Sequence, residues 1–180
     1  MSPASASYIK NFKVLRVYCK IMKYYGNHNN ILSMFSTILI CKIQKICFYS
    51  KGYKLDGTIY LPDDYQPGEK RPAIIPNSGY QGFNEFYPRL FARNLTQAGY
   101  VCLGFDYRGF AKSEGDKGRV ILDEQVEDII NAVSFLQAQS EVNPDQVGLL
   151  GWGMGGSNVV RVAAKDKRVK AVAALNGFFD

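Results

Sequence analysis

Acidic residues are missing from the first fifty positions of the sequence, which hold seven Lys or Arg and no Asp or Glu. The other 130 positions hold fifteen Lys or Arg and sixteen Asp or Glu, so the net charge of +6 divides into +7 and −1. Because the second part is close to neutral, no nucleic-acid partner is expected for it. The charge instead marks a boundary between two segments of different composition.

Long hydrophobic runs are also missing. The longest candidate, residues 31–41, is interrupted by Ser33, Ser36 and Thr37 and ends before Lys42. A membrane-spanning helix needs roughly 20 consecutive apolar residues. The sequence therefore predicts no stable membrane span.

Histidine is scarce, and the cysteines are not paired in sequence. The single histidine, His28, lies in a polar stretch and is interpreted as a solvated loop residue without a catalytic role. Cys19, Cys41, Cys47 and Cys102 show no C-x-x-C spacing, which indicates free thiols in a reducing compartment and no metal site. Cys102 lies in an apolar run and is predicted to be a buried strand residue rather than a nucleophile. No cofactor is expected.

Residues 1–45 form a basic N-terminal extension whose structure the sequence does not define. Three interpretations stay open: a poorly selected extension or mis-assigned start, a targeting segment, and a helix that binds a membrane surface or a partner. Targeting segments are typically rich in Arg, whereas Arg16 is the single arginine here. A cytoplasmic location is the default expectation, and organelle targeting by residues 1–45 remains an alternative.

Residues 46–180 show regular alternation of strand and helix patterns and are predicted to form one partial domain. Expected strands cover residues 46–49, 53–61, 73–76, 100–105, 147–150 and 169–175, and expected helices cover 85–98, 120–139 and 157–165. The first two strands predict a β-hairpin. The rest predicts an α/β fold, a mostly parallel sheet with helices on both faces.

Three loops follow strands of this sheet and are expected to lie together: residues 77–82, 106–115 and 151–156. Ligands of open α/β sheets bind at the carboxyl ends of the strands. We therefore expect any ligand site in these loops.

The loop at 151–156, Gly-Trp-Gly-Met-Gly-Gly, has two interpretations. Gly151, Gly153 and Gly156 fit a dinucleotide-binding fingerprint, which would indicate part of an oxidoreductase. The acidic residue that normally supports this motif after the next strand is replaced by Asn176. The alternative is G-x-S-x-G, the sharp strand-to-helix turn that presents a serine nucleophile, with Gly153 at the serine position.

Residues 106–115, DYRGFAKSEG, decide between these interpretations. They resemble the D-x-R-G-x-G-x-S-x-G loop of α/β-hydrolases, with Ala111 in place of one glycine. The chain from residue 46 is thus similar to the N-terminal half to two-thirds of that family. The branch that it resembles contains dienelactone hydrolase-like and serine aminopeptidase-like esterases.

The resemblance implies a mechanism that this sequence only partly supports. In the family, a serine attacks a carboxylic ester, thioester or amide carbonyl, a histidine and an acid assist it, and two backbone N–H groups bind the oxyanion. The matching oxyanion donors are the N–H groups of Met154 and Tyr80, but Gly153 has no side chain, and the acid and histidine would follow it in sequence. The resemblance implies a small acyl compound as the substrate or ligand, if there is one. We expect a catalytically inactive chain, with a non-catalytic binding module or a gene fragment as alternatives.

Several other residues near these loops have structural interpretations. Ser157 is predicted to be a helix residue and Ser78 a turn former. Ser113 and Arg108 match positions that pin the 106–115 loop by hydrogen bonding, and Trp152 is expected to pack beside the pocket.

The last predicted strand, residues 169–175, has a further consequence. It would form an apolar sheet edge with unpaired backbone groups, so self-association through this edge is expected. For the same reason we expect the chain to be a fragment of a longer protein or a gene remnant.

Overall fold

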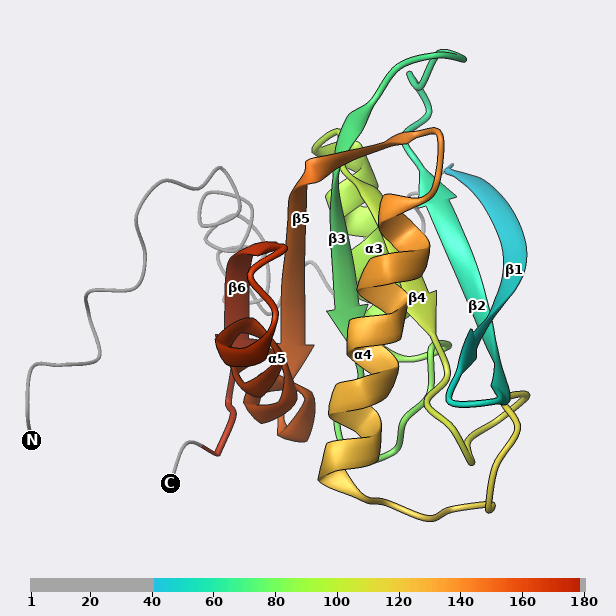
Figure 1. Ribbon diagram of the computed structural model, residues 1–180. Coiled ribbons are helices and arrows are strands. Elements are labelled where there is room, and N and C mark those ends of the chain that lie inside the picture. The colour runs from blue at the N-terminus through green and yellow to red at the C-terminus, as the bar shows by residue number, and fades with distance from the viewer. Residues whose placement is uncertain (1–40, 179–180) are drawn as a thin grey trace, which may run out of the picture. The chain divides into compact units, whose positions relative to one another are not determined.

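The structure is a computed structural model that describes residues 41–178 (Figure 1). Residues 1–40, which include His28, Cys19 and nearly all of the predicted N-terminal extension, lie outside the described residues. No helix within residues 41–178 is long and apolar enough to cross a membrane.

One six-stranded sheet organises the described chain, in the order β1-β2-β4-β3-β5-β6. The pairs β1–β2 and β2–β4 are antiparallel, whereas β3–β4, β3–β5 and β5–β6 are parallel. The predicted fold class is confirmed: a hairpin precedes a mostly parallel sheet. The elements in chain order are β1 (Lys42–Ser50), β2 (Tyr53–Leu61), β3 (Arg71–Asn77), α3 (Tyr87–Gln97), β4 (Val101–Phe105), α4 (Leu122–Gln137), β5 (Val142–Trp152), α5 (Met154–Lys165) and β6 (Val169–Leu175).

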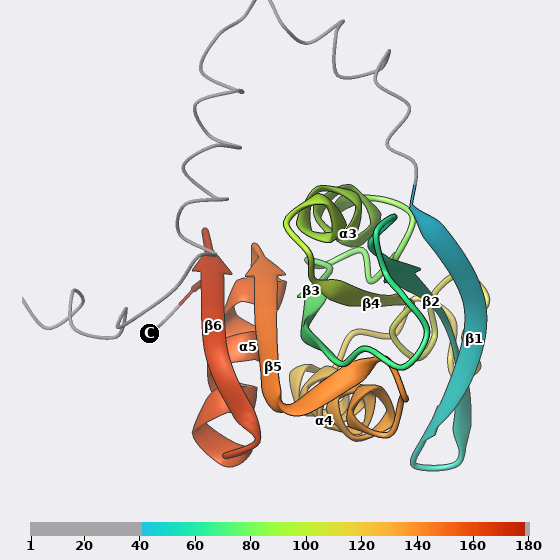
Figure 2. The same ribbon diagram turned by 90° about the horizontal axis from the view of Figure 1, so that it is seen from above.

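Helices cover both faces of the sheet. Figure 2 shows α3 on one face and α4 and α5 side by side on the other. The main core lies between the strands and α4, because the apolar stripe of α4 faces the sheet. Its fully buried side chains include Leu55, Ile59, Ile75, Leu103, Ile129, Val133, Leu136 and Leu149.

Three strands are longer than the sequence predicts. β3 covers Arg71–Asn77 instead of residues 73–76. β1 begins at Lys42 instead of Ile46, because it pairs with β2 along the whole length of that strand, to Leu61. β5 begins at Val142 and runs through Pro144, where a turn was expected. Val142 still pairs with Arg71 of β3, and a register shift accommodates the irregular segment that follows it.

The helix α5 begins at Met154, three residues before the predicted start. Gly155 and Gly156 have low helix propensity and concealed this start in the sequence. In the structure both glycines are buried in the first turn, where α5 packs closely against neighbouring backbone. The helix therefore follows directly after β5, with only Gly153 between them.

Candidate functional site

A sharp turn at Gly153 connects β5 to α5. Gly153 has φ 57° and ψ −125°, a conformation that favours glycine. Its N–H donates to the carbonyl of Leu175 at the end of β6 (2.8 Å), and its carbonyl accepts from the N–H of Gly156 (2.8 Å). A Cβ built on Gly153 would have no heavy atom within 4 Å. The backbone of the turn thus has the shape that would present a side chain at position 153. Because Gly153 has none, that position faces open space.

The flanking glycines are required for a different reason, which is close packing. A Cβ on Gly151 would lie far inside 3.0 Å of the Gly155 carbonyl oxygen. A Cβ on Gly155 would approach the Ser78 carbonyl oxygen equally closely. Backbone from β3, β5 and α5 therefore meets here without room for side chains, as the G-x-S-x-G interpretation expects.

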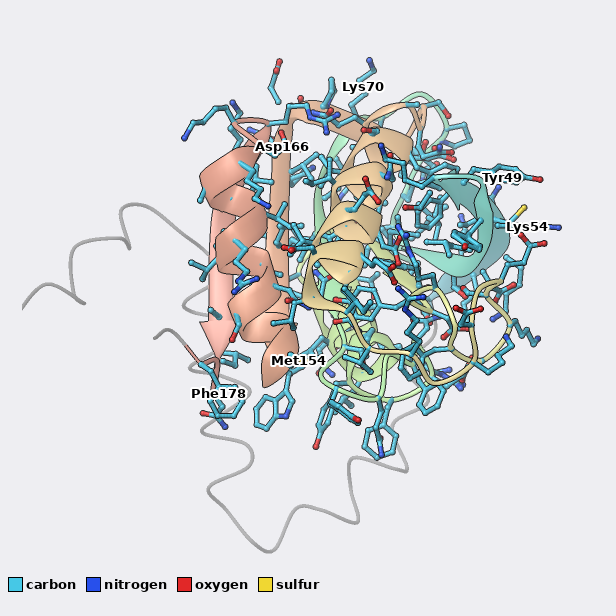
Figure 3. All side chains as sticks on the ribbon, turned by 60° about the horizontal axis from the view of Figure 1, so that its bottom comes forward. Tyr49, Lys54, Lys70, Met154, Asp166 and Phe178 are labelled. Carbon is cyan, nitrogen blue, oxygen red and sulfur yellow. The ribbon has the colours of Figure 1, made fainter. Side chains whose placement is uncertain are left out.

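A pocket of about 740 Å³ opens beside this turn. Figure 3 shows Met154 at the start of α5 and Phe178 beyond β6 at the same end of the molecule. The lining residues that the sequence did not indicate include Leu122, Val160, Arg161 and Phe178. The other lining residues are Ser78, Gly79, Tyr80, Gln81, Phe83, Phe86, Tyr87, Trp152, Gly153, Met154 and Ser157.

The two predicted oxyanion donors both border this pocket. Met154 is the first residue of α5, so its N–H is one of the helix N-terminal groups that have no partner within the helix. Neither the Met154 N–H nor the Tyr80 N–H donates to a backbone or side-chain acceptor among residues 41–178. Both N–H groups are therefore available to a ligand oxygen, and their oxyanion role stays a prediction.

The two serines at the pocket differ in their hydrogen bonding. The Ser157 hydroxyl donates to the Phe178 carbonyl (2.6 Å) and accepts from the Phe178 N–H (2.7 Å). Both functions of this hydroxyl are thus used to hold the segment after β6. Ser78 is only 4% exposed, and its hydroxyl has no hydrogen-bond partner within the described chain.

Aromatic side chains form one wall of the pocket. The rings of Trp152 and Tyr87 stack with their centroids 5.1 Å apart and an interplanar angle of 23°. The ring of Phe86 packs edge-on against Tyr87 at 5.1 Å. Trp152 lies beside the pocket as predicted, and the wall gives apolar contact area for a ligand.

The 106–115 loop is pinned from two sides, which agrees with the prediction for Ser113 and Arg108. The Ser113 hydroxyl donates to the Asp106 carbonyl (2.6 Å) and accepts from the Asp56 N–H (2.9 Å). The Arg108 guanidinium donates to buried Asp128 of α4 (2.6 Å and 2.9 Å). Ala111, which replaces a family glycine, keeps a positive φ of 39°.

A buried amide beneath the pocket was not predicted from the sequence. The Asn77 side-chain NH₂ donates to the carbonyls of Ile75 (2.7 Å) and Leu150 (3.2 Å), and so ties the end of β3 to β5. The Tyr107 hydroxyl donates to the Asn77 side-chain oxygen at 3.4 Å. Burial raises the pKa of Tyr107, which keeps this hydroxyl protonated as a donor. Asn77 therefore sets the relative position of Ser78 and the turn at Gly153.

Among the described residues no other nucleophile replaces a serine at position 153. Cys102 is fully buried in β4, and burial raises the pKa of its thiol well above the usual value. It is a thiol rather than a thiolate, as predicted. Cys41, Cys47 and Cys102 are free cysteines.

Comparison with known families agrees with this geometry. Residues 51–180 match the family described as X-Pro dipeptidyl-peptidase (S15 family). The chain belongs to the S15 family. This family falls within the α/β-hydrolase superfamily, so the resemblance noted in the sequence is confirmed. Gly151, Gly153 and Gly156 also fit a dinucleotide-binding fingerprint, but the family that the chain matches is a peptidase family.

Individual relatives and a solved structure are also similar to this chain. An uncharacterized 31.7 kDa protein of Escherichia coli is 37% identical over 62% of this chain and 39% of its own length. The thiohydrolase aneE of Aspergillus aculeatus is 32% identical over 69% of this chain and 38% of its own. The crystal structure of the α/β hydrolase GrgF from a Penicillium species superposes with a TM-score of 0.67 at 26% identity, covering 73% of this chain and 44% of that one. The chain thus spans about two-fifths of the length of these proteins.

Proposed function

We propose that this chain is a non-hydrolytic member of the S15 family, which binds a small acyl compound in the pocket beside Gly153. The observation that carries the proposal is Gly153 itself: the turn keeps the conformation that presents a nucleophile but has only hydrogen there. Removing one member of a catalytic triad lowers kcat by a factor on the order of 10⁴ to 10⁶.

The binding part of the site remains available. The N–H groups of Met154 and Tyr80 supply two donors for a carbonyl oxygen, and the wall of Trp152 and Tyr87 supplies apolar surface. Acyl compounds are the ligand class that such a site fits, because they combine a carbonyl acceptor with an apolar chain. The name of the Aspergillus relative, a thiohydrolase, points to the same class.

Within the described chain, neither of the two pocket serines, Ser78 and Ser157, has the partners that a nucleophile needs. Ser157 holds Phe178 through both functions of its hydroxyl, and no histidine lies within residues 41–178 to activate Ser78. Hydrolysis by either serine would also require an acid and a base for which the described residues offer no arrangement of the triad type.

The test is an esterase assay with the full chain. We expect p-nitrophenyl acetate to be hydrolysed no faster with the protein than with buffer or heat-denatured protein, and a fluorophosphonate probe to form no adduct by intact mass. Saturable turnover that disappears in Ser78→Ala or Ser157→Ala would overturn the proposal, because it would identify a working nucleophile.

A further inference from the structure

We propose that the pocket selects the free carboxylic acid, in its ionised form, over the ester or amide of the same acyl group. This inference rests on the proposed function and names its ligand class. Three independent features of the pocket point to it: the empty volume at Gly153, the donors around that volume, and the charge of the lining.

The empty volume has the shape that a carboxylate needs. In an acyl-serine, the acyl carbon carries one oxygen in the oxyanion hole and a second oxygen, the serine Oγ, at the turn. Here nothing lies within 4 Å of the position of a Gly153 Cβ. A free carboxylate can therefore place one oxygen at the N–H groups of Met154 and Tyr80 and its other oxygen where a serine Oγ would lie.

The donors favour a charged oxygen over a neutral one. The Met154 N–H stands at the N-terminus of the twelve-residue helix α5, where the helix dipole stabilises negative charge. Hydrogen bonds to an ionised acceptor are roughly twice as strong as those between neutral groups. Ser78 adds a hydroxyl that lines the pocket, belongs to a residue 4% exposed, and has no partner in residues 41–178. A pocket hydroxyl without a partner in the protein can donate to an anionic acceptor, and such a hydrogen bond is stronger than one to a neutral acceptor.

The charge of the lining points in the same direction. Within residues 41–178, Arg161 is the one charged residue that lines the pocket, and no acidic residue of this part of the chain lines it. Its nearest acidic partner, Asp123, is 3.7 Å away with its side chain 81% exposed, so solvent screens that ion pair. Arg161 lies seven residues after Met154, about 10 Å along α5, and attracts an anion without touching the oxyanion donors. The aromatic wall of Trp152 and Tyr87 then receives the apolar part of the acid.

The experiment uses the full chain and the intrinsic fluorescence of Trp152, which is the single tryptophan in the sequence. The probes are 3-phenylpropanoate, its methyl ester and its amide, titrated at neutral pH. We expect the acid to bind at least about tenfold more tightly than the ester or the amide. Arg161→Gln should weaken the acid about twofold, in a salt-dependent way, and leave the ester unchanged.

Gly153→Ser and Gly153→Ala form the matched pair of variants. Both impose the same positive φ on a side chain, and circular dichroism establishes that each is folded. The serine hydroxyl fills the place of the second carboxylate oxygen, so Gly153→Ser should weaken acid binding and reduce the preference for the acid over the ester. Gly153→Ala, which lacks that oxygen, should weaken the acid less.

The outcomes separate the two proposals. Equal binding of acid and ester, or acid binding that Gly153→Ser leaves intact, would overturn the carboxylate inference and leave the non-hydrolytic proposal standing. Conversion of the ester to the acid by the wild-type chain would overturn the proposed function. If no probe changes the fluorescence or displaces another, both proposals are wrong.

Discussion

The glycines around the turn allow a paired prediction, because the same added methyl group should have different effects at two positions. At Gly153 the new Cβ meets open space, so Gly153→Ala adds only the backbone strain of a side chain at φ 57°. Strain of this kind amounts to about 1–3 kcal/mol. We expect a folded variant with its free energy of unfolding reduced by that amount.

At Gly155 the new Cβ would lie far inside 3.0 Å of the Ser78 carbonyl oxygen. Overpacking of ordinary side chains costs about 1–3 kcal/mol, and a backbone atom cannot rotate away as a side chain can. Gly155→Ala should therefore destabilise the protein by more than about 3 kcal/mol, or prevent folding. It should also move the loop that carries Ser78 and Tyr80.

Urea denaturation followed by far-UV circular dichroism measures both effects, with wild-type protein as the reference. Equal destabilisation by the two variants would contradict the structure, because it would mean that the spaces at Gly153 and Gly155 are alike. A Gly155→Ala variant as stable as wild type would refute the close approach of α5 to Ser78.

Three further predictions concern the rest of the described chain. Asp128→Asn should lower the free energy of unfolding by about 3–5 kcal/mol, since it removes the buried negative charge beside the Arg108 guanidinium and leaves Glu127 as its acidic partner. A loss below about 1 kcal/mol in urea denaturation would contradict this. Hydrogen bonds from Arg168 lower the pKa of Asp166. The ionised carboxylate therefore stabilises the fold at pH values above its unfolded-state pKa, and this stabilisation is lost as the pH falls through its folded-state pKa. Asp166→Asn should therefore reduce the melting temperature at neutral pH and match wild type in strong acid, and an equal deficit at both pH values would refute the assignment. We also propose self-association through the outer edge of β6: sedimentation velocity should show concentration-dependent oligomers that Val172→Lys abolishes, and a monomer at every concentration would show the edge to be inert.

Most of the fold could be predicted because its local patterns agree with its tertiary structure. β6 has the predicted bounds, and α3 and α4 differ from prediction by two residues or fewer at each end. The differences arise where tertiary contacts override local preference. Pairing with Arg71 draws Val142 into β5 although Pro144 indicates a turn, and close packing makes Gly155 helical although glycine disfavours helices.

The backbone of the site and some of its side chains, such as Trp152, were predictable. Glycine spacing identified the turn at Gly153, and the strand order placed Tyr80 and Met154 at the same pocket. The distant contributors could not be found, because Leu122 and Phe178 reach the pocket only through the packing of α4 and β6. Asn77 was also missed, since nothing in a strand sequence indicates that a buried amide will bridge two strands.

The proposed property of the pocket beside Gly153 is that it binds an acyl compound and leaves it intact. Its most direct test combines binding and chemistry in one sample: methyl 3-phenylpropanoate is titrated into the full chain, Trp152 fluorescence is followed, and the ester is then recovered and quantified by chromatography. We predict a saturable change in fluorescence with complete recovery of the ester. A fluorescence change accompanied by protein-dependent formation of 3-phenylpropanoate, or no change at any ester concentration, would contradict the claim.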